Sequence, residues 1–218
     1  MRLRRIAERF PDDVVVKWRP FALRPFQPAE PFVFQGSYVE RGWKSAASMT
    51  EGDGIRYQMW NCGALPRWSM PALWAGAAAL LQGDELFRRF HLALFRAFFS
   101  RSLDPTDPEI VVEVARESDL DTKRFQADLA DPALRDQITS DAERAALRER
   151  VQAVPTVVVA DRFRLQGAVS ESHYLKALAD CGLSAAAEET RGSTERVIDS
   201  GFVRLDDVRE RSQHDQPE

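Results

Sequence analysis

Two thiols and a Val-Pro-Thr stretch are the parts of this sequence that could carry redox or binding chemistry. The cysteines, Cys62 and Cys181, form neither a Cys-x-x-Cys nor a metal-ligand spacing, which favours two unpaired thiols over a structural disulfide. Cys181 precedes Gly182 at the end of a predicted helix, where the negative end of the helix dipole disfavours a thiolate. Cys62 is the only candidate for a reactive thiol, and a plain structural cysteine is the simpler interpretation.

The remaining polar residues give no hydrolytic, nucleotide or metal site. His91 alternates with a phenylalanine stripe and is expected to fill a helix surface, whereas His173 falls in the first turn of the last helix. Ser69 is not part of a G-x-S-x-G elbow. The sequence has no G-x-G-x-x-G, Walker loop or H-E-x-x-H. We therefore expect neither a metal ion nor a bound nucleotide.

Pro155 stands at the mouth of a predicted strand. In "VPTVVVADRFRLQGA", residues 157–160 and 163–166 are β-branched or alternating, and the link between them is short enough for an antiparallel hairpin. Proline is tolerated as the first residue of a strand. A cis X-Pro bond at the same place would instead mark a tight turn. The residues alone leave these two interpretations open.

The other elements follow from periodicity and from helix caps. "VVVKW" (14–18) is a compact β-branched strand that follows a short helix and ends near Phe21, because prolines crowd the next residues. Residues 35–70 predict an irregular connection with one short helix around 38–48. Residues 71–150 predict a helical block of about five segments, three of them begun by Asp107, Asp121 and Asp131 as N-caps. A last helix follows the hairpin.

Composition narrows the possible partners. The formal net charge is −4, and residues 188–218 hold nine acidic and five basic residues, so the rest of the chain is balanced. This balance favours neither nucleic acid nor an anionic membrane surface as a partner. The longest apolar run is about half of what a bilayer span needs. We expect a cytoplasmic protein with a mobile acidic tail at 184–218.

Three stretches resemble the DsbA-like family, in particular its FrnE-like oxidoreductases and their relatives, the 2-hydroxychromene-2-carboxylate isomerases and kappa-class glutathione transferases. "VVVKWRPFALRP" is similar to the family's second strand and its exit. "AGAAALLQGDELFRRFHLALFRAFF" resembles the helical insertion, and "VPTVVVADRFRLQGA" resembles the X-Pro strand and hairpin. The resemblance implies an α/β, thioredoxin-like fold with a large all-helical insertion and an N-terminally truncated sheet. Residues 1–34 and 151–183 would form its thioredoxin-like part, 35–70 a connection and 71–150 the insertion.

The resemblance also implies a site and an activity. The Val154–Pro155 bond would be cis, and Val154, Pro155 and Thr156 would bind a thiol or disulfide substrate, protein or small molecule, with Phe21 and Leu23 walling the cleft. The family's redox centre would lie upstream of Met1, so no catalytic residue is expected within this chain. The function implied is thiol–disulfide exchange. The alternatives are a glutathione-dependent isomerase or transferase, with glutathione as cofactor, and a non-catalytic thioredoxin-fold module. Such a module would bind peptides or small thiols, or would pair with a second copy through an open sheet edge.

Overall fold

The computed structural model describes residues 1–183 and 196–200, and for the second range only the backbone is considered. The elements in chain order are α1 (Arg2–Arg9), β1 (Val14–Trp18), α2 (Tyr38–Met49), α3 (Met70–Leu80), α4 (Asp84–Arg101), α5 (Pro108–Glu117), α6 (Thr122–Ala130), α7 (Pro132–Leu147), β2 (Thr156–Val159), β3 (Phe163–Gln166), α8 (Glu171–Asp180) and β4 (Arg196–Ser200). The predicted strands, hairpin and helical block are all present, within a few residues of the expected bounds.

The sheet has four strands in the order β1-β4-β2-β3. β1 and β4 are parallel, whereas β2 is antiparallel to both β4 and β3. The sequence predicts three strands and places 184–218 in a mobile tail. The structure differs because Arg196–Ser200 enters the sheet; the rest of that tail lies outside the described residues.

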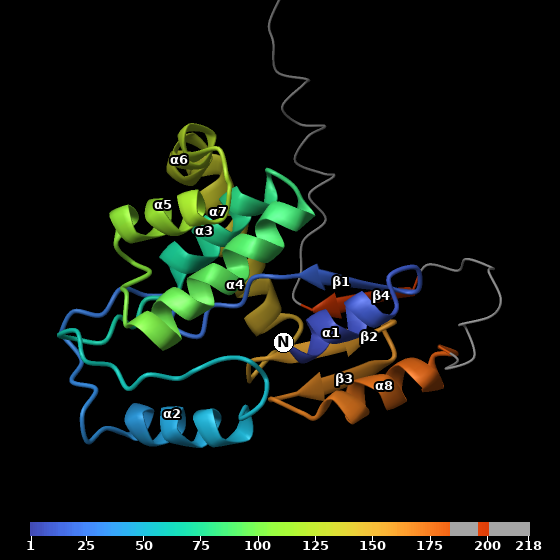
Figure 1. Ribbon diagram of the computed structural model, residues 1–218. Coiled ribbons are helices and arrows are strands. Elements are labelled where there is room, and N and C mark those ends of the chain that lie inside the picture. The colour runs from blue at the N-terminus through green and yellow to red at the C-terminus, as the bar shows by residue number, and fades with distance from the viewer. Residues whose placement is uncertain (184–195, 201–218) are drawn as a thin grey trace, which may run out of the picture.

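One face of the sheet is covered by α1 and α8 (Figure 1). Val157 and Val159 are 1% exposed and pack with Val14 of β1, Ile6 of α1 and Leu178 of α8. Alternate residues of β2 are therefore buried, as expected for a strand with one covered face. This cluster holds the hairpin and the two flanking helices together.

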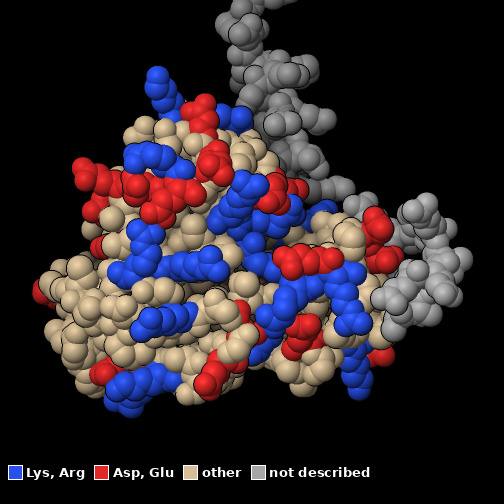
Figure 2. All heavy atoms as spheres, viewed as in Figure 1, with Lys and Arg blue, Asp and Glu red and all other residues tan. Residues whose placement is uncertain are grey.

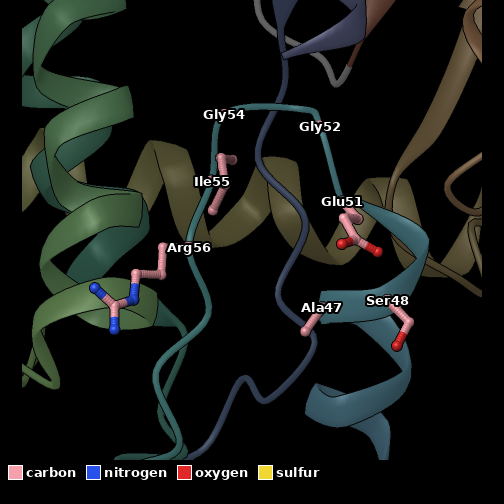
Figure 3. Close-up of a pocket in the computed structure, with 7 residues that line it drawn as sticks. All are labelled: Ala47, Ser48, Glu51, Gly52, Gly54, Ile55 and Arg56. Atoms are coloured by element: carbon pink, nitrogen blue, oxygen red, sulfur yellow. The ribbon is translucent and has the colours of Figure 1, made fainter.

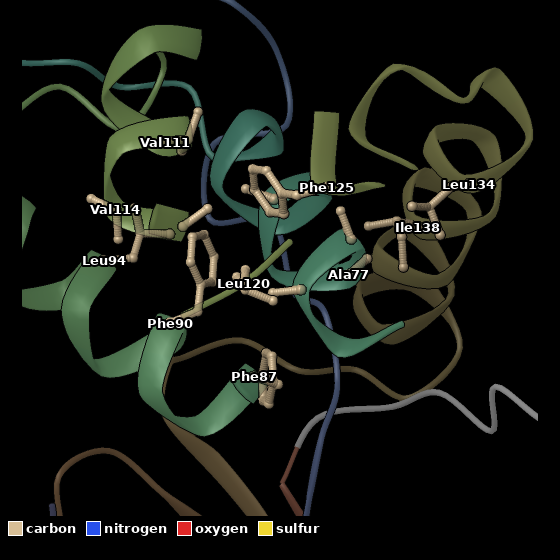
Figure 4. Packing of buried hydrophobic residues seen from close by; sticks show 14 of the residues in the cluster. Ala77, Phe87, Phe90, Leu94, Val111, Val114, Leu120, Phe125, Leu134 and Ile138 are labelled. Atoms are coloured by element: carbon tan, nitrogen blue, oxygen red, sulfur yellow. The ribbon is translucent and has the colours of Figure 1, made fainter. Parts of the chain in front are cut away.

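The helical block α3–α7 lies beside the end of the sheet that holds the carboxyl end of β1 (Figure 1). Its core is built around the fully buried rings of Phe90 and Phe125, whose centroids are 5.4 Å apart (Figure 4). The alanine-rich helix α3 packs against the other helices of the block, and small side chains such as those of Ala77 and Ala78 allow that close approach. Each such buried phenylalanine contributes about 2 kcal/mol of apolar burial.

The connection between β1 and α3 is not wholly irregular. It contains α2, at the position where the sequence predicts a short helix, and a third buried cluster. That cluster surrounds Trp43 and Trp60 with Phe34, Leu65 and the ring of Phe98. The tryptophans of this stretch thus anchor α2 and its loops against the end of α4.

Candidate functional site

The candidate site centres on the loop that leads into β2. The Val154–Pro155 peptide bond is cis. The Thr156 hydroxyl donates to the carbonyl of Ala153 at 2.6 Å, and the N–H of Gly167 donates to the carbonyl of Pro155 at 2.8 Å. These two hydrogen bonds fix the loop on both sides of Val154.

Val154 itself is left open. Its residue is 47% exposed, and within the described part of the chain neither its N–H nor its carbonyl has a hydrogen-bond partner. A free donor and acceptor on exposed backbone beside a strand can pair with an extended peptide in the manner of an added strand. The chemistry this loop offers is recognition through backbone hydrogen bonds.

The loop lies where three strand ends meet. β4 runs antiparallel to β2, with Val158 opposite Asp199, and parallel to β1, with Trp18 opposite Ser200. The carboxyl ends of β1 and β4 therefore lie at the same end of the sheet as the amino end of β2. The N-terminus of the chain lies on this side as well (Figure 1).

Trp18 and His91 form an aromatic contact at that end of the sheet. The Trp18 ring lies 5.4 Å from Phe87 and 6.4 Å from His91, and His91 is 4.9 Å from Phe95. Burial, together with the nearby charges of Arg4 and the N-terminal amine, lowers the pKa of His91 to about 4. The imidazole is therefore neutral at pH 7, and it packs against these aromatic rings.

Phe21 and Leu23, the other residues expected to wall the site, come from a different strand. They lie beyond the end of β1, which β4 separates from β2. Phe21 is half-buried and Leu23 is 54% exposed. The neighbouring backbone of Arg24 exchanges two hydrogen bonds with Ser69, its N–H with the hydroxyl and its carbonyl with the N–H. The described hydrogen bonds thus tie this segment to the start of α3 and not to residues 154–156.

The two thiols belong to other segments of the structure than the loop. Cys62 is exposed in the connection between α2 and α3, and Cys181 is half-buried at the end of α8. The carbonyl of Asp180 accepts a hydrogen bond from Arg162 in the hairpin turn, at the end of β2 opposite Pro155. A four-residue strand spans about 13 Å. Cys181 is therefore separated from the loop by the length of the sheet.

Two partly buried ion pairs near the N-terminus were not predicted from the sequence. Asp53, with a side chain 12% exposed, accepts from Arg2 at 2.9 Å and from Arg5 at 2.7 Å. Burial raises the pKa of Asp53, but the ion pairs with Arg5 and Arg2 outweigh it and hold the pKa below its usual value. Arg2 also donates to the carbonyls of Ala168 and Val169, just before α8.

Basic side chains gather across the middle of the face shown in Figure 2, where α1 and α4 lie. Arg4 of α1 donates to the carbonyl of Arg88 of α4 at 2.7 Å. Burial and the charges of Arg88 and Arg96 lower the pKa of Arg4. This contact joins the first helix to the helical block.

A hollow of about 640 Å³ opens between α2 and residues 51–56 (Figure 3). It is lined by Ala47, Ser48, Glu51, Gly52, Gly54, Ile55 and Arg56. None of these is a thiol or an imidazole, and none belongs to the predicted site. The Arg56 side chain points away from Glu51 in this view, so the hollow presents no converging polar groups.

Within residues 1–183 and the short range 196–200, no cluster of three or more His, Cys, Asp or Glu could hold a metal ion. Over the same residues, every helix is too short or too polar to cross a bilayer.

Comparison with known proteins points to one family. The model of the DSBA-like thioredoxin domain matches residues 1–179. A crystal structure of a proposed protein disulfide isomerase from Nitrosomonas europaea superposes with a TM-score of 0.64 at 15% identity, covering 82% of this chain and 87% of the other. A proposed DsbA oxidoreductase from Streptomyces coelicolor gives a TM-score of 0.67 at 22% identity, covering 88% and 85%. No curated protein matches the sequence.

Proposed function

Because the chain belongs to the family of DSBA-like thioredoxin domains, we propose that it is a DsbA-type thiol–disulfide oxidoreductase whose substrate-binding side is built by these residues. The fold is thioredoxin-like with a helical insertion, as the family match and the similar crystal structures show. Val154, Pro155 and Thr156 are proposed to bind the substrate, an extended polypeptide carrying a thiol or disulfide. Phe21 and Leu23 are proposed to form the opposite wall.

The open backbone of Val154 is the observation that carries this proposal. Its N–H and carbonyl lack partners among the described residues, while Thr156 and Gly167 hold the loop in place around it. A backbone that is already fixed loses little conformational entropy when a peptide pairs with it. This arrangement supports binding of an extended chain without demanding a particular side chain.

The exchange step needs a thiolate that attacks a disulfide sulfur. The 218 residues contain no Cys-x-x-Cys, and Cys181 lies at the other end of β2 from the loop. We therefore expect these residues alone to bind substrate but to show no dithiol turnover above background. Two unpaired thiols also support a reducing, cytoplasmic location.

A non-catalytic binding module is the second candidate function. The observation in its favour is that β4 joins β1 to β2, so the described residues already form one continuous sheet. A complete sheet with an open recognition loop could bind peptides and transfer no electrons. Both candidate functions use the same binding loop. They differ in whether a redox-active pair of cysteines lies beside that loop.

Binding should be tested with the 218-residue chain and a fluorescent, unstructured peptide that contains one cysteine. Val154→Pro removes the free N–H, and the loss of that hydrogen bond should weaken binding roughly tenfold. Val33→Pro is the matched control, because Val33 is 69% exposed in another loop. Fluorescence anisotropy measures both affinities.

Equal affinities for the wild type and Val154→Pro would contradict the binding assignment. Binding of glutathione but not of the peptide would favour the isomerase or transferase alternative. Disulfide turnover by the wild-type chain that disappears in Cys62→Ser would show that Cys62 is a redox-active thiol, contrary to this proposal.

A further inference from the structure

β4 lies outside the part of the chain that defines the family, yet it occupies an inner position of the sheet. The family match ends at residue 179, and β4 begins at Arg196. In the strand order β1-β4-β2-β3, β4 has hydrogen-bonded neighbours on both sides. Among the described residues it is the one strand paired with β1. Removing it would divide the sheet into a lone strand and a hairpin.

We infer that residues 1–183 present a strand-shaped slot between β1 and β2, and that Arg196–Ser200 of the same chain fills it as a closing strand. The slot fixes the direction of its occupant, which must run parallel to β1 and antiparallel to β2. It also fixes the register, since Val14 faces Arg196 and Val159 faces Ile198. An empty slot would expose two unpaired strand edges, which proteins avoid.

The path of the chain favours the strand of the same molecule over that of a second copy. α8 ends beside the β2–β3 turn, because Arg162 in the turn donates to the carbonyl of Asp180. β4 begins at that end of the sheet too, since Ile198 faces Val159, the last residue of β2. The two ends to be joined therefore lie at the same side. Residues 184–195 provide up to about 40 Å of chain for the connection.

The topology of the connection agrees with this assignment. β3 and β4 are both antiparallel to β2 and hence parallel to each other. Parallel strands need a crossover of a dozen or more residues, most often a helix. α8 lies between β3 and β4 in the chain and covers the sheet face. β3, α8 and β4 thus form an ordinary crossover unit, one strand apart.

Hydrogen exchange of the full chain tests whether the slot is filled. The backbone amides of 196–200 should exchange roughly 100-fold more slowly than in a synthetic peptide of the same sequence, and those of β1 should be protected with them. In Ile198→Pro, which removes a donor from an inner strand, protection of both strands should fall together. Ser212→Pro, placed beyond β4, is the control and should leave both protected. Exchange of 196–200 at the peptide rate in the wild type would overturn the inference, as would unchanged β1 protection in Ile198→Pro.

A cross-link identifies the occupant without perturbing the fold. In a background of Cys62→Ser and Cys181→Ser, Val16→Cys with Ile198→Cys places two thiols at registered positions of neighbouring strands. Mild oxidation should give a monomeric, internally linked chain. The pair Val16→Cys with Asp199→Cys is out of register, falls on opposite faces and should not link. A covalent dimer from the first pair would show that a second copy supplies the strand, and absence of any link would contradict the register; either result overturns the inference.

Discussion

His91 packs among Trp18, Phe87 and Phe95, and its pKa of about 4 couples its protonation to folding. An exposed histidine has a pKa near 6.5. Because the folded-state value is lower, the unfolded chain binds more protons between pH 6.5 and 4. The stability that the neutral imidazole contributes is complete above pH 6.5 and is lost as the pH falls toward 4.

We predict that the free energy of unfolding decreases by up to about 3 kcal/mol between pH 7 and pH 4 on account of His91. His91→Phe keeps an aromatic ring and removes the titration, so its stability should change less over this interval. His173→Gln, on the exposed face of α8, is the matched control and should follow the wild type. Urea denaturation at each pH provides the measurement. Parallel pH profiles for wild type and His91→Phe would refute the role of His91.

At the scale of single residues, the sequence predicts those groups whose role depends on their neighbours in the chain. The Val-Pro-Thr stretch can be picked out because proline is confined to a few positions of a strand, of which the first residue is one. The ion pairs of Asp53 give no such signal, because 48 residues separate it from Arg5 and "EGDG" reads only as a turn. The free backbone of Val154 is equally hidden, since it depends on which neighbours the fold supplies.

At the scale of elements, local signals again decide what can be predicted. Asp107, Asp121 and Asp131 each accept hydrogen bonds from the first turn of the helix that the sequence assigns to them. A cap and its helix are adjacent in the chain, so the pattern is sufficient. β4 is different because "RVIDS" is short and its registered partners lie far away in the chain, 182 residues in β1 and 39 or 41 residues in β2. Its strand character comes from the slot that receives it.

The packing of α3 against Trp18 gives a prediction for Gly76. This glycine is buried, but a Cβ added to it would lie 3.5 Å from two carbons of the Trp18 ring and 3.8 Å from Phe87, which are ordinary contacts. Gly76→Ala should therefore be tolerated and should gain up to about 1 kcal/mol from helix propensity. Gly76→Val adds two further methyl groups and should cost about 1–3 kcal/mol through overpacking.

The two variants are compared by chemical denaturation with tryptophan fluorescence. A gain in stability for Gly76→Ala with a loss for Gly76→Val would show that the contact with Trp18 has room for one methyl group and no more. A loss for both variants would show that α3 needs glycine here to approach the sheet. A loss of several kcal/mol already in Gly76→Ala would mean that α3 lies closer to β1 than the structure shows.

At the scale of the whole molecule, three buried clusters must be held in one arrangement. β1 contributes to two of them: Val14 packs with α1 and α8, whereas Trp18 packs with α3 and α4. The third cluster, around Trp43, reaches the helical block through Phe98 and Phe99 of α4. The block is thus joined to both other parts by aromatic side chains.

The remaining link, between the α2 region and the sheet part, is electrostatic. Asp53 follows α2, and its partners Arg2 and Arg5 belong to α1, which packs on the sheet. Arg5 pairs in addition with Glu171 at the start of α8, at 2.8 Å. One carboxylate therefore lies between two guanidinium groups that would otherwise repel each other.

We predict that Asp53→Asn destabilises the protein by about 1–2 kcal/mol at pH 7, because two arginines lose a largely buried partner. Since the folded-state pKa of Asp53 is lowered, its contribution is present above about pH 4 and is lost below it, a lower interval than that of His91. The variant and wild type should therefore converge in stability as the pH falls below 4. Glu51→Gln, an exposed carboxylate two residues away, is the control and should change stability little.

Hydrogen exchange of Asp53→Asn adds a spatial test: protection of the backbone amides should fall first at residues 49–54 and at the start of α8. Loss confined to the helical block would show that these ion pairs do not join the two parts.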